Sequence, residues 1–221
     1  MIGQVQAPVD FRDAQTDVRQ QGDRPTCVAF AVTGAHEWMA GDKPDLSEEF
    51  ALWCAKARDG LTGEATTVVA ALAGIAAEGQ ALSECWPYGV PRYTEGPPLD
   101  ALDRSKRRHP GRWRPLANAR IATIGQALAM GDAVMLTVDF VPAAWFTAIN
   151  GWIEAAPQAA VVGGHAVLAV GVVSARGTHS PSVIVKNSWG PRWGDQGYGY
   201  LSEGYLIDYG RQAHALAGRA P

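Results

Sequence analysis

The sequence predicts an α+β protein, with helices in its N-terminal half and strands in its C-terminal half. In the first 80 positions, apolar residues recur at the three- and four-residue spacing of amphipathic helices. From residue 133 onwards they form short continuous runs, which are typical of buried strands. A stretch rich in proline and glycine, CWPYGVPRYTEGPPLD, separates the region with the helical pattern from the region with the strand pattern. We therefore divide the chain into a helical part, residues 1–115, and a β-rich part, residues 116–221, which form one unit.

Three helices are predicted in the helical part. The first follows Thr26, a suitable N-cap residue, and Pro25, which keeps the approach extended. The second follows Ser47, because a capping serine and two glutamates favour a helix N-terminus. The third, ATTVVAALAGIAAEG, ends at Gly79.

The β-rich part is expected to begin with one more helix, IATIGQALAMG, before the strands. Four apolar runs then predict strands, separated by Gly, Pro, Ser and Asn: AVMLTVDF, HAVLAVGVVS, SVIVKNSW and GYGYLSEGYLI.

Composition and charge exclude several classes of function. A net charge of −3 gives no general attraction to nucleic acid or to an anionic membrane. No stretch approaches the roughly 20 apolar residues that a membrane span needs. Residues 103–115 carry six Lys or Arg. We interpret them as a solvated, mobile loop, with a polyanion-binding patch as the alternative.

The N-terminus lacks the cationic start and apolar core of a secretory signal. The 3 cysteines are too few for a disulfide framework, and their odd number leaves at least one thiol free. We therefore predict a cytoplasmic location, with export by another route as the alternative. The excess of Arg over Lys, 15 against 4, and the many alanines favour a bacterial origin.

Cys27 lies at the predicted start of the first helix. Unpaired backbone N–H groups and the helix dipole favour negative charge there, which stabilises the nucleophilic thiolate. The alternative is a small buried apolar residue, as most cysteines are.

His165 heads an apolar strand behind Gly163 and Gly164. In this interpretation the imidazole lies at the edge of a cleft, and the glycines leave room for substrate. The ring would pair with the thiolate and later protonate a leaving amine. The alternative is a histidine at a strand edge without a catalytic role.

Asn187 ends the strand predicted to run beside that of His165. Its amide oxygen is suited to accept a hydrogen bond from the far imidazole nitrogen and so orient the ring. Trp189, two residues on, is the apolar body that would keep water off this bond. An asparagine in a strand-ending turn is unremarkable otherwise.

Together, QGDRPTCVAF, GGHAVLAVG and KNSWGPRWGDQGYGYL resemble the papain family of cysteine peptidases. Cys27 and His165 are 138 residues apart, inside the family's window of roughly 130–150. PVDFRD, LSEEFALWC and CWPYG also resemble family segments, whereas residues 89–115 and 140–162 are the least recognisable.

The resemblance implies a papain-like two-lobed fold with an antiparallel, β-barrel-like C-terminal lobe and an active-site cleft between the lobes. It places Cys27 on the helical wall and His165 with Asn187 on the β wall. It also gives Gln21 a role, because its side-chain amide would form the oxyanion hole with the backbone N–H of Cys27. The implied reaction is acyl transfer through a Cys27 thioester, which needs no metal or organic cofactor.

The sequence departs from the family pattern at several positions. Arg24 and Val28 replace a disulfide cysteine and an aromatic residue beside the nucleophile. The glycines that would let substrate approach the helical wall are reduced to Gly60 and Gly63, of which Gly63 is the candidate contact. Leu136 and Ala166 fall where the family builds its main specificity pocket, which favours an apolar substrate side chain.

Cys54 and Cys85 are expected to be free, buried thiols, with a disulfide between them as the alternative. Only 26 residues precede Cys27, which leaves no room for an inhibitory prosegment. We therefore expect restraint by an inhibitory or activating protein partner, by narrow specificity or by the compartment.

The leading function is a thiol peptidase, an endopeptidase that cuts a protein or peptide substrate. The same residues also serve deamidases, transamidases and peptide-maturation enzymes, because only the acyl acceptor differs. A non-catalytic binding module is the third hypothesis.

Overall fold

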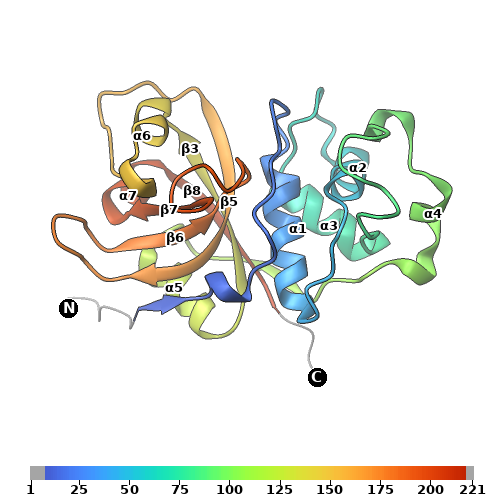
Figure 1. Cartoon of the computed structure of the whole chain (residues 1–221), viewed down its shortest axis with the longest axis horizontal. Helices are drawn as coiled ribbons and strands as arrows, with labels where there is room; N and C mark the ends of the chain where they lie inside the picture. Colours follow the sequence, from blue (N-terminus) through green and yellow to red (C-terminus); the bar gives the residue numbers. More distant parts are fainter. Residues whose placement is uncertain (1–7, 218–221) are drawn as a thin grey trace.

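A computed structural model describes residues 8–217 as a group of helices packed beside one large sheet (Figure 1). The α-helices are α1 (Cys27–Ala40), α2 (Glu48–Asp59), α3 (Val68–Glu78), α4 (Leu99–Leu102), α5 (Ile121–Ala129), α6 (Pro142–Phe146) and α7 (Glu203–Tyr209). Single 3₁₀ turns span Arg12–Ala14, Tyr93–Glu95, Arg104–Lys106 and Ile149–Gly151.

The strands form an eight-stranded sheet in the order β2-β8-β3-β5-β6-β7-β4, with β1 paired to β5. They are β1 (Val9–Asp10), β2 (Trp113–Pro115), β3 (Ala133–Phe140), β4 (Trp152–Ile153), β5 (Gly163–Val173), β6 (Ser182–Lys186), β7 (Tyr198–Ser202) and β8 (Gly210–Leu216). All neighbours are antiparallel except β4 and β7. The predicted α+β class is confirmed, and the sheet also takes in β1 and β2 from the first 115 residues.

Local signals account for several helix ends. The Ser47 hydroxyl accepts the Phe50 N–H at 3.0 Å, and Gly79 ends α3 with a positive φ of 76°. Thr26 precedes α1 as predicted, but its hydroxyl does not cap the helix and instead bonds the Tyr88 hydroxyl at 2.7 Å. A tertiary contact therefore replaces the local cap.

The last predicted strand, residues 197–207, is partly wrong. β7 ends at Ser202, whose hydroxyl accepts the Tyr205 N–H at 3.1 Å and starts α7. The same serine therefore ends the strand and caps the helix. β8 follows α7 directly. The sequence does not predict it, because the apolar run before it gives no sign of where α7 ends and β8 begins.

The helices meet the sheet through α1, which lies against β5 (Figure 1). A continuous apolar cluster joins α1, α2 and α3 to the inner residues of β3 and β5. Gly34 permits the close approach, since a Cβ there would lie 3.3 Å from the Leu168 side chain. This contact brings the N-terminus of α1 to the strand that carries His165.

The basic segment 103–115 is bonded to the rest of the fold rather than free: its first part is attached to the helices, and its last three residues form β2, which pairs with β8. Arg107 is buried and donates to the carbonyl oxygens of Glu78, Ala101 and Leu102. Arg108 pairs with Asp42 at 2.9 Å. None of the helices between residues 8 and 217 combines the length and hydrophobicity that a bilayer span requires.

Arg24 ties the loop before α1 to the rest of the helical lobe. Its guanidinium donates two hydrogen bonds to Glu49 on α2, at 2.7 and 2.9 Å, and one to Glu64 at 2.9 Å. Glu49 is fully buried. At the position where the family pattern has a disulfide cysteine, this chain thus has a buried ion pair.

Replacing Arg24 is expected to destabilise the fold strongly. Arg24→Met leaves the Glu49 carboxylate buried without its counter-charge, which should lower the free energy of unfolding by about 3–5 kcal/mol. Urea unfolding followed by tryptophan fluorescence measures this loss. Arg108→Met is the matched control, because its pair with Asp42 is about half exposed and should contribute less than about 1 kcal/mol. Equal losses in the two variants would contradict the anchoring role.

Candidate active site

A groove of about 590 Å³ runs between the start of α1 and the ends of the sheet strands. The loop before α1 and residues 65–68 form its helical side. The ends of β3, β5 and β8, together with Trp189, form its other side. Among its lining residues are Gln21, Cys27, Gly164, His165, Ala166 and Trp189.

Cys27 is the first residue of α1 and is partly exposed to the groove. Burial raises the pKa of its thiol, while the backbone N–H groups of Ala166, Val28 and Cys27 itself act in the opposite direction. Ala166 directly follows His165 on β5. The sulfur therefore lies against the strand that presents the imidazole.

His165 is buried, and its Nε2 lies 2.8 Å from Asn187 Oδ1. Oδ1 also accepts the Ser188 backbone N–H at 2.8 Å, which fixes the orientation of the amide. Because this oxygen only accepts, Nε2 must carry the hydrogen, and Nδ1 of the neutral ring is then the basic nitrogen.

Aromatic rings surround the imidazole. Trp189 stacks on it at 4.9 Å between ring centroids, and Trp145 meets it edge-on at 5.0 Å. Phe140 is the third ring, at 5.9 Å. This apolar surrounding disfavours a charged ring, so burial lowers the pKa of His165 to about 4, against the opposing effect of the Asn187 hydrogen bond.

Gln21 is buried at the end of the groove and its side chain is held at both ends. The Ser188 hydroxyl donates to Oε1 at 2.5 Å, and Nε2 donates to the Arg24 carbonyl at 2.7 Å. One of the two Nε2 hydrogens remains for another acceptor. The amide is thus fixed in the groove that Cys27 also lines, without exhausting its donors.

Of the predicted substrate contacts, Gly164, Ala166 and Trp189 line the groove, but Leu136 and Gly63 do not. Leu136 is fully buried in the sheet core, and its neighbours Thr137 and Val138 contribute to the wall instead.

Gly63 lies outside the groove, where its carbonyl accepts a hydrogen bond from the Tyr93 hydroxyl at 3.3 Å. Residues 65–68 occupy the wall there. The groove also includes Gln212, which sequence reasoning missed because it lies on the unpredicted β8.

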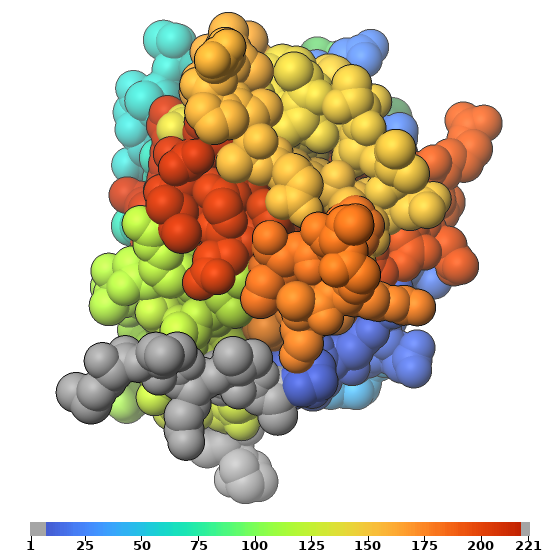
Figure 2. Space-filling model, turned by 90° about the vertical axis from the view of Figure 1, so that its left-hand side faces the viewer, coloured from blue at the N-terminus to red at the C-terminus, as the bar shows by residue number. Residues whose placement is uncertain are grey.

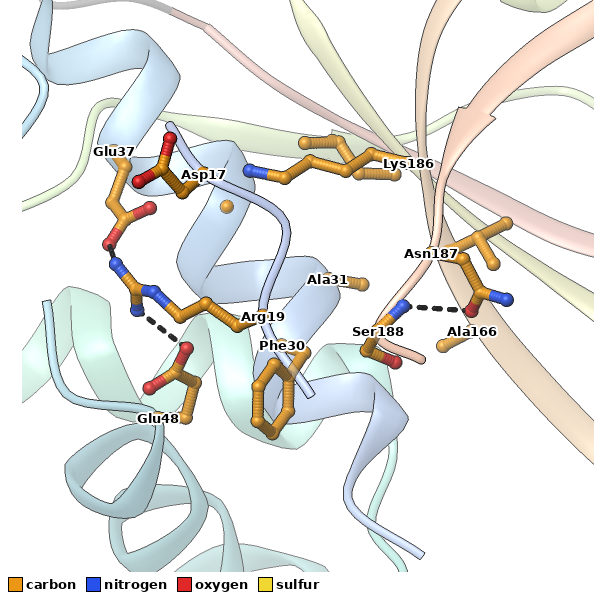
Figure 3. Close-up of a pocket in the computed structure, with 13 residues that line it drawn as sticks. Asp17, Arg19, Phe30, Ala31, Glu37, Glu48, Ala166, Lys186, Asn187 and Ser188 are labelled. Carbon is orange, nitrogen blue, oxygen red and sulfur yellow. Dashed lines mark hydrogen bonds and ion pairs between the residues drawn. The ribbon is translucent and has the colours of Figure 1, made fainter. Parts of the chain in front are cut away.

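Buried charges lie directly behind the site, around a cavity of about 20 Å³ (Figure 3). Arg19 donates to Glu37 on α1 at 2.6 Å and to Glu48 on α2 at 2.5 Å. Lys186, which precedes Asn187, donates to the Thr16 carbonyl at 2.7 Å.

The hydroxyl of Thr16 in turn donates to Glu37 at 2.5 Å, so hydrogen bonds connect β6 to the helices. Desolvation lowers the pKa of Lys186 to about 8 and raises that of Glu48 to about 6. Both shifts reflect the enclosure of this cluster between the sheet and the helices.

Comparison with known proteins identifies the family of this chain. Residues 5–218 match the papain family of cysteine proteases. Chymopapain of Carica papaya is 29% identical over 198 residues, 86% of this chain and 53% of the relative. Pro-cathepsin H of Bos taurus is 30% identical over 223 residues, 91% of this chain and 58% of the relative. The chain thus spans somewhat more than half the length of these relatives.

Solved structures share the fold. Xylellain, a cysteine protease from Xylella fastidiosa, superposes with a TM-score of 0.80 at 18% identity, covering 96% of this chain and 86% of that one. The Carica candamarcensis cysteine protease CMS1MS2, solved in complex with E-64, gives a TM-score of 0.70 at 22% identity, covering 96% and 99%. These likenesses confirm the predicted papain-like fold. On the match over nearly its whole length, this chain belongs to the papain family of cysteine proteases.

Proposed function

We propose that this chain is a cysteine peptidase that hydrolyses peptide bonds within a protein or peptide substrate. One observation carries the proposal: a cysteine at a helix N-terminus shares a groove with a histidine whose far nitrogen is held by Asn187. Cys27 is the proposed nucleophile and His165 the proposed acid and base. Asn187 orients the ring, and Gln21 with the Cys27 backbone N–H forms the oxyanion hole.

An endopeptidase is favoured by the position of the basic segment 103–115. In exopeptidase relatives an insertion blocks one end of the cleft, and residues 103–115 are the segment of this chain that could do so. Its first part is bonded to Glu78, Gln80 and Ala101 on the helical side, its last three residues pair with β8 as strand β2, and none of its residues lines the groove. A substrate chain can therefore extend along the groove without meeting this segment.

The pKa shifts indicate how protons are distributed before the reaction. Burial raises the pKa of Cys27 and lowers that of His165, so an isolated charge on either group is unfavourable. A proton passing from the thiol to Nδ1 creates both charges at once and leaves the pair neutral overall. The N-terminus of α1 then stabilises the thiolate, and Asn187 stabilises the ring cation.

The reaction follows as two acyl transfers. The Cys27 sulfur attacks the substrate carbonyl, and the oxyanion accepts hydrogen bonds from Gln21 Nε2 and the Cys27 N–H. The C–N bond breaks as His165 gives its proton to the leaving amine. Water then attacks the thioester while His165 takes the water's proton. The C–S bond breaks and releases the acid, and the proton passes from His165 to the sulfur, which restores the thiol.

Cleavage of a peptide library, followed by mass spectrometry, tests the proposal. Internal cleavage by the parent protein, and none by Cys27→Ala, is the expected result. Mass changes of one unit, or cross-linked products, would instead indicate a deamidase or a transamidase. Failure of an electrophilic peptide probe to label Cys27 faster than Cys54 and Cys85 would indicate a binding module.

Gln21→Ala is expected to lower kcat by about 10²–10³ while changing KM little, because the oxyanion forms only during the reaction. Steady-state kinetics on a cleaved library peptide provide both constants. Gln20→Ala is the control, since Gln20 is the exposed neighbour that donates to the Trp189 carbonyl. A rise in KM at constant kcat would contradict the assigned role.

The buried neutral imidazole also predicts a pH effect on stability. The unfolded chain protonates His165 near pH 6.5, but the folded chain does so only near pH 4, so unfolding takes up a proton between these values. Stability should therefore fall as pH falls through this window, with His165 accounting for roughly 3 kcal/mol.

Urea unfolding of the parent and of His165→Gln at pH 6.5 and 4.5 measures this contribution. The variant should lose less stability on acidification than the parent does. Equal losses would mean that the ring is already charged in the folded protein, as a resting ion pair with Cys27.

We also propose a reducing, cytoplasmic location and an inhibitory or activating protein partner. Residues 8–217 contain three free cysteines, which supports the expected free thiols. Cys54 is buried among Phe50, Trp86 and Ala101 as expected, whereas Cys85 is only partly buried. Location and partner otherwise rest on the sequence arguments above, as does a bacterial origin.

A further inference from the structure

The segment from Gln21 to Cys27 carries both donors proposed for the oxyanion hole. One is the side-chain amide of Gln21, and the other is the backbone N–H of Cys27, the first residue of α1. The helix fixes the second donor, because Cys27 belongs to it. The first donor lies six residues earlier in the chain, so its position relative to Cys27 depends on the contacts of this loop.

Tyr88 connects these two positions. Its hydroxyl donates to the Gln21 carbonyl at 2.9 Å and lies 2.7 Å from the Thr26 hydroxyl. The phenol has one hydrogen and the carbonyl can only accept it, so the Thr26 hydroxyl must donate to the Tyr88 oxygen. A chain of two hydrogen bonds therefore leads from the residue before Cys27 through Tyr88 to Gln21. Hydrogen bonds in such a chain polarise and strengthen one another.

The Tyr88 ring is held independently of its hydroxyl. Phe30 on α1 meets it edge-on at 4.9 Å between ring centroids, and the Arg24 guanidinium lies over it at 4.6 Å. The N–H of the next residue, Gly89, donates to Glu49 at 2.8 Å. The ring is thus a fixed support for the loop. Phenylalanine in its place would keep these contacts and lose only the two hydrogen bonds.

Gln21 is held by both halves of the molecule. On the sheet side, the Ser188 carbonyl accepts the Gln21 N–H at 2.8 Å, and the Ser188 hydroxyl donates to Oε1. On the helical side, Tyr88 holds the Gln21 carbonyl. The sheet contacts place Gln21 relative to β6, whereas Tyr88 places it relative to α1. Tyr88 is not among the residues that line the groove, so a substrate lying there does not contact it.

Resting on the proposed function, we infer that Tyr88 is a positioning residue for the oxyanion hole. Its hydroxyl relates the Gln21 amide to the start of α1, so that both donors point at the same oxyanion. Stabilisation of an oxyanion depends on donors that are in place before the reaction. Loss of the hydroxyl should therefore destabilise the transition state more than it weakens substrate binding.

Two tyrosine variants test the inference. Tyr88→Phe should lower kcat on a cleaved library peptide about five- to twentyfold, less than the loss of the Gln21 amide itself, and change KM less than about twofold. Tyr209→Phe is the matched control, because the Tyr209 hydroxyl also donates to a backbone carbonyl, that of Ala156, at 2.8 Å. Tyr209 lies on α7, which Figure 2 shows in red beside the loop after β4, in gold. The control should leave both constants unchanged.

A double-mutant cycle separates positioning from a general structural effect. In the Gln21→Ala background, Tyr88→Phe should lower kcat less than about twofold, because the donor that it places is absent. Thr26→Val in the parent protein should lower kcat as Tyr88→Phe does, since it breaks the same chain of hydrogen bonds. Equal losses from Tyr88→Phe in the two backgrounds would overturn the inference. So would parent-like kcat in Tyr88→Phe or in Thr26→Val, or a loss that appears in KM alone.

Alkylation of Cys27 shows whether Tyr88 acts on the nucleophile instead. Iodoacetamide reacts with the thiolate by displacement of iodide and forms no oxyanion, so Tyr88→Phe should be alkylated at the parent's rate. A fall in this rate that matches the fall in kcat would overturn the inference. Absence of peptide cleavage by the parent protein would contradict the proposed function instead.

A measurement on Gln21 itself keeps the inference testable without turnover. Labelling with isotope-enriched glutamine, together with the spectrum of Gln21→Ala, assigns the Gln21 side-chain amide by NMR. Its heteronuclear NOE should be that of an ordered group in the parent and in Tyr209→Phe, and should fall in Tyr88→Phe. The same NOE in all three proteins would reject Tyr88 as the residue that positions Gln21.

Discussion

The contact of α1 with β5 is the interaction on which the rest of this structure depends. It joins the start of a helix, where negative charge is favoured, to a strand that presents an imidazole. Gly34 permits the approach, and the apolar cluster around it holds the two elements together. The same burial disfavours a lone charge on Cys27 or on His165, and so couples their ionisation.

Holding the two halves in register requires polar contacts as well as apolar ones. The buried cluster of Arg19, Glu37 and Lys186 lies immediately behind Asn187 and joins β6 to α1 through Thr16. Such a cluster fixes the placement of the sheet relative to the helices more than it adds net stability, because its hydrogen bonds are satisfied only in one relative placement. The Arg24–Glu49 pair likewise fixes the placement of the loop that carries Gln21.

The sequence predicts best the features that depend on few, local residues. Ser47 and Gly79 act within one helical turn, and the His165–Asn187 contact follows from adjacent strands. The groove walls depend on distant contacts and on irregular pairing: Leu136 is buried in the sheet core, whereas Thr137 and Val138, on either side of a shift in the β3–β8 register, both line the groove. Gln212 could not be found at all without the strand that carries it.

This difference separates the residues proposed for bond cleavage from the other residues around the groove. The residues proposed for bond cleavage come from the segments that most resemble the family, whereas Phe146 and Val162 both lie within residues 140–162, one of the least recognisable stretches. Helix α6 belongs to this stretch and contacts the His165 ring. Trp145 is buried and packs edge-on against the imidazole, whereas Phe146 is exposed and stacks on Trp189, which in turn stacks on the same imidazole. Two neighbouring residues of one short helix therefore support His165, one directly and one through Trp189.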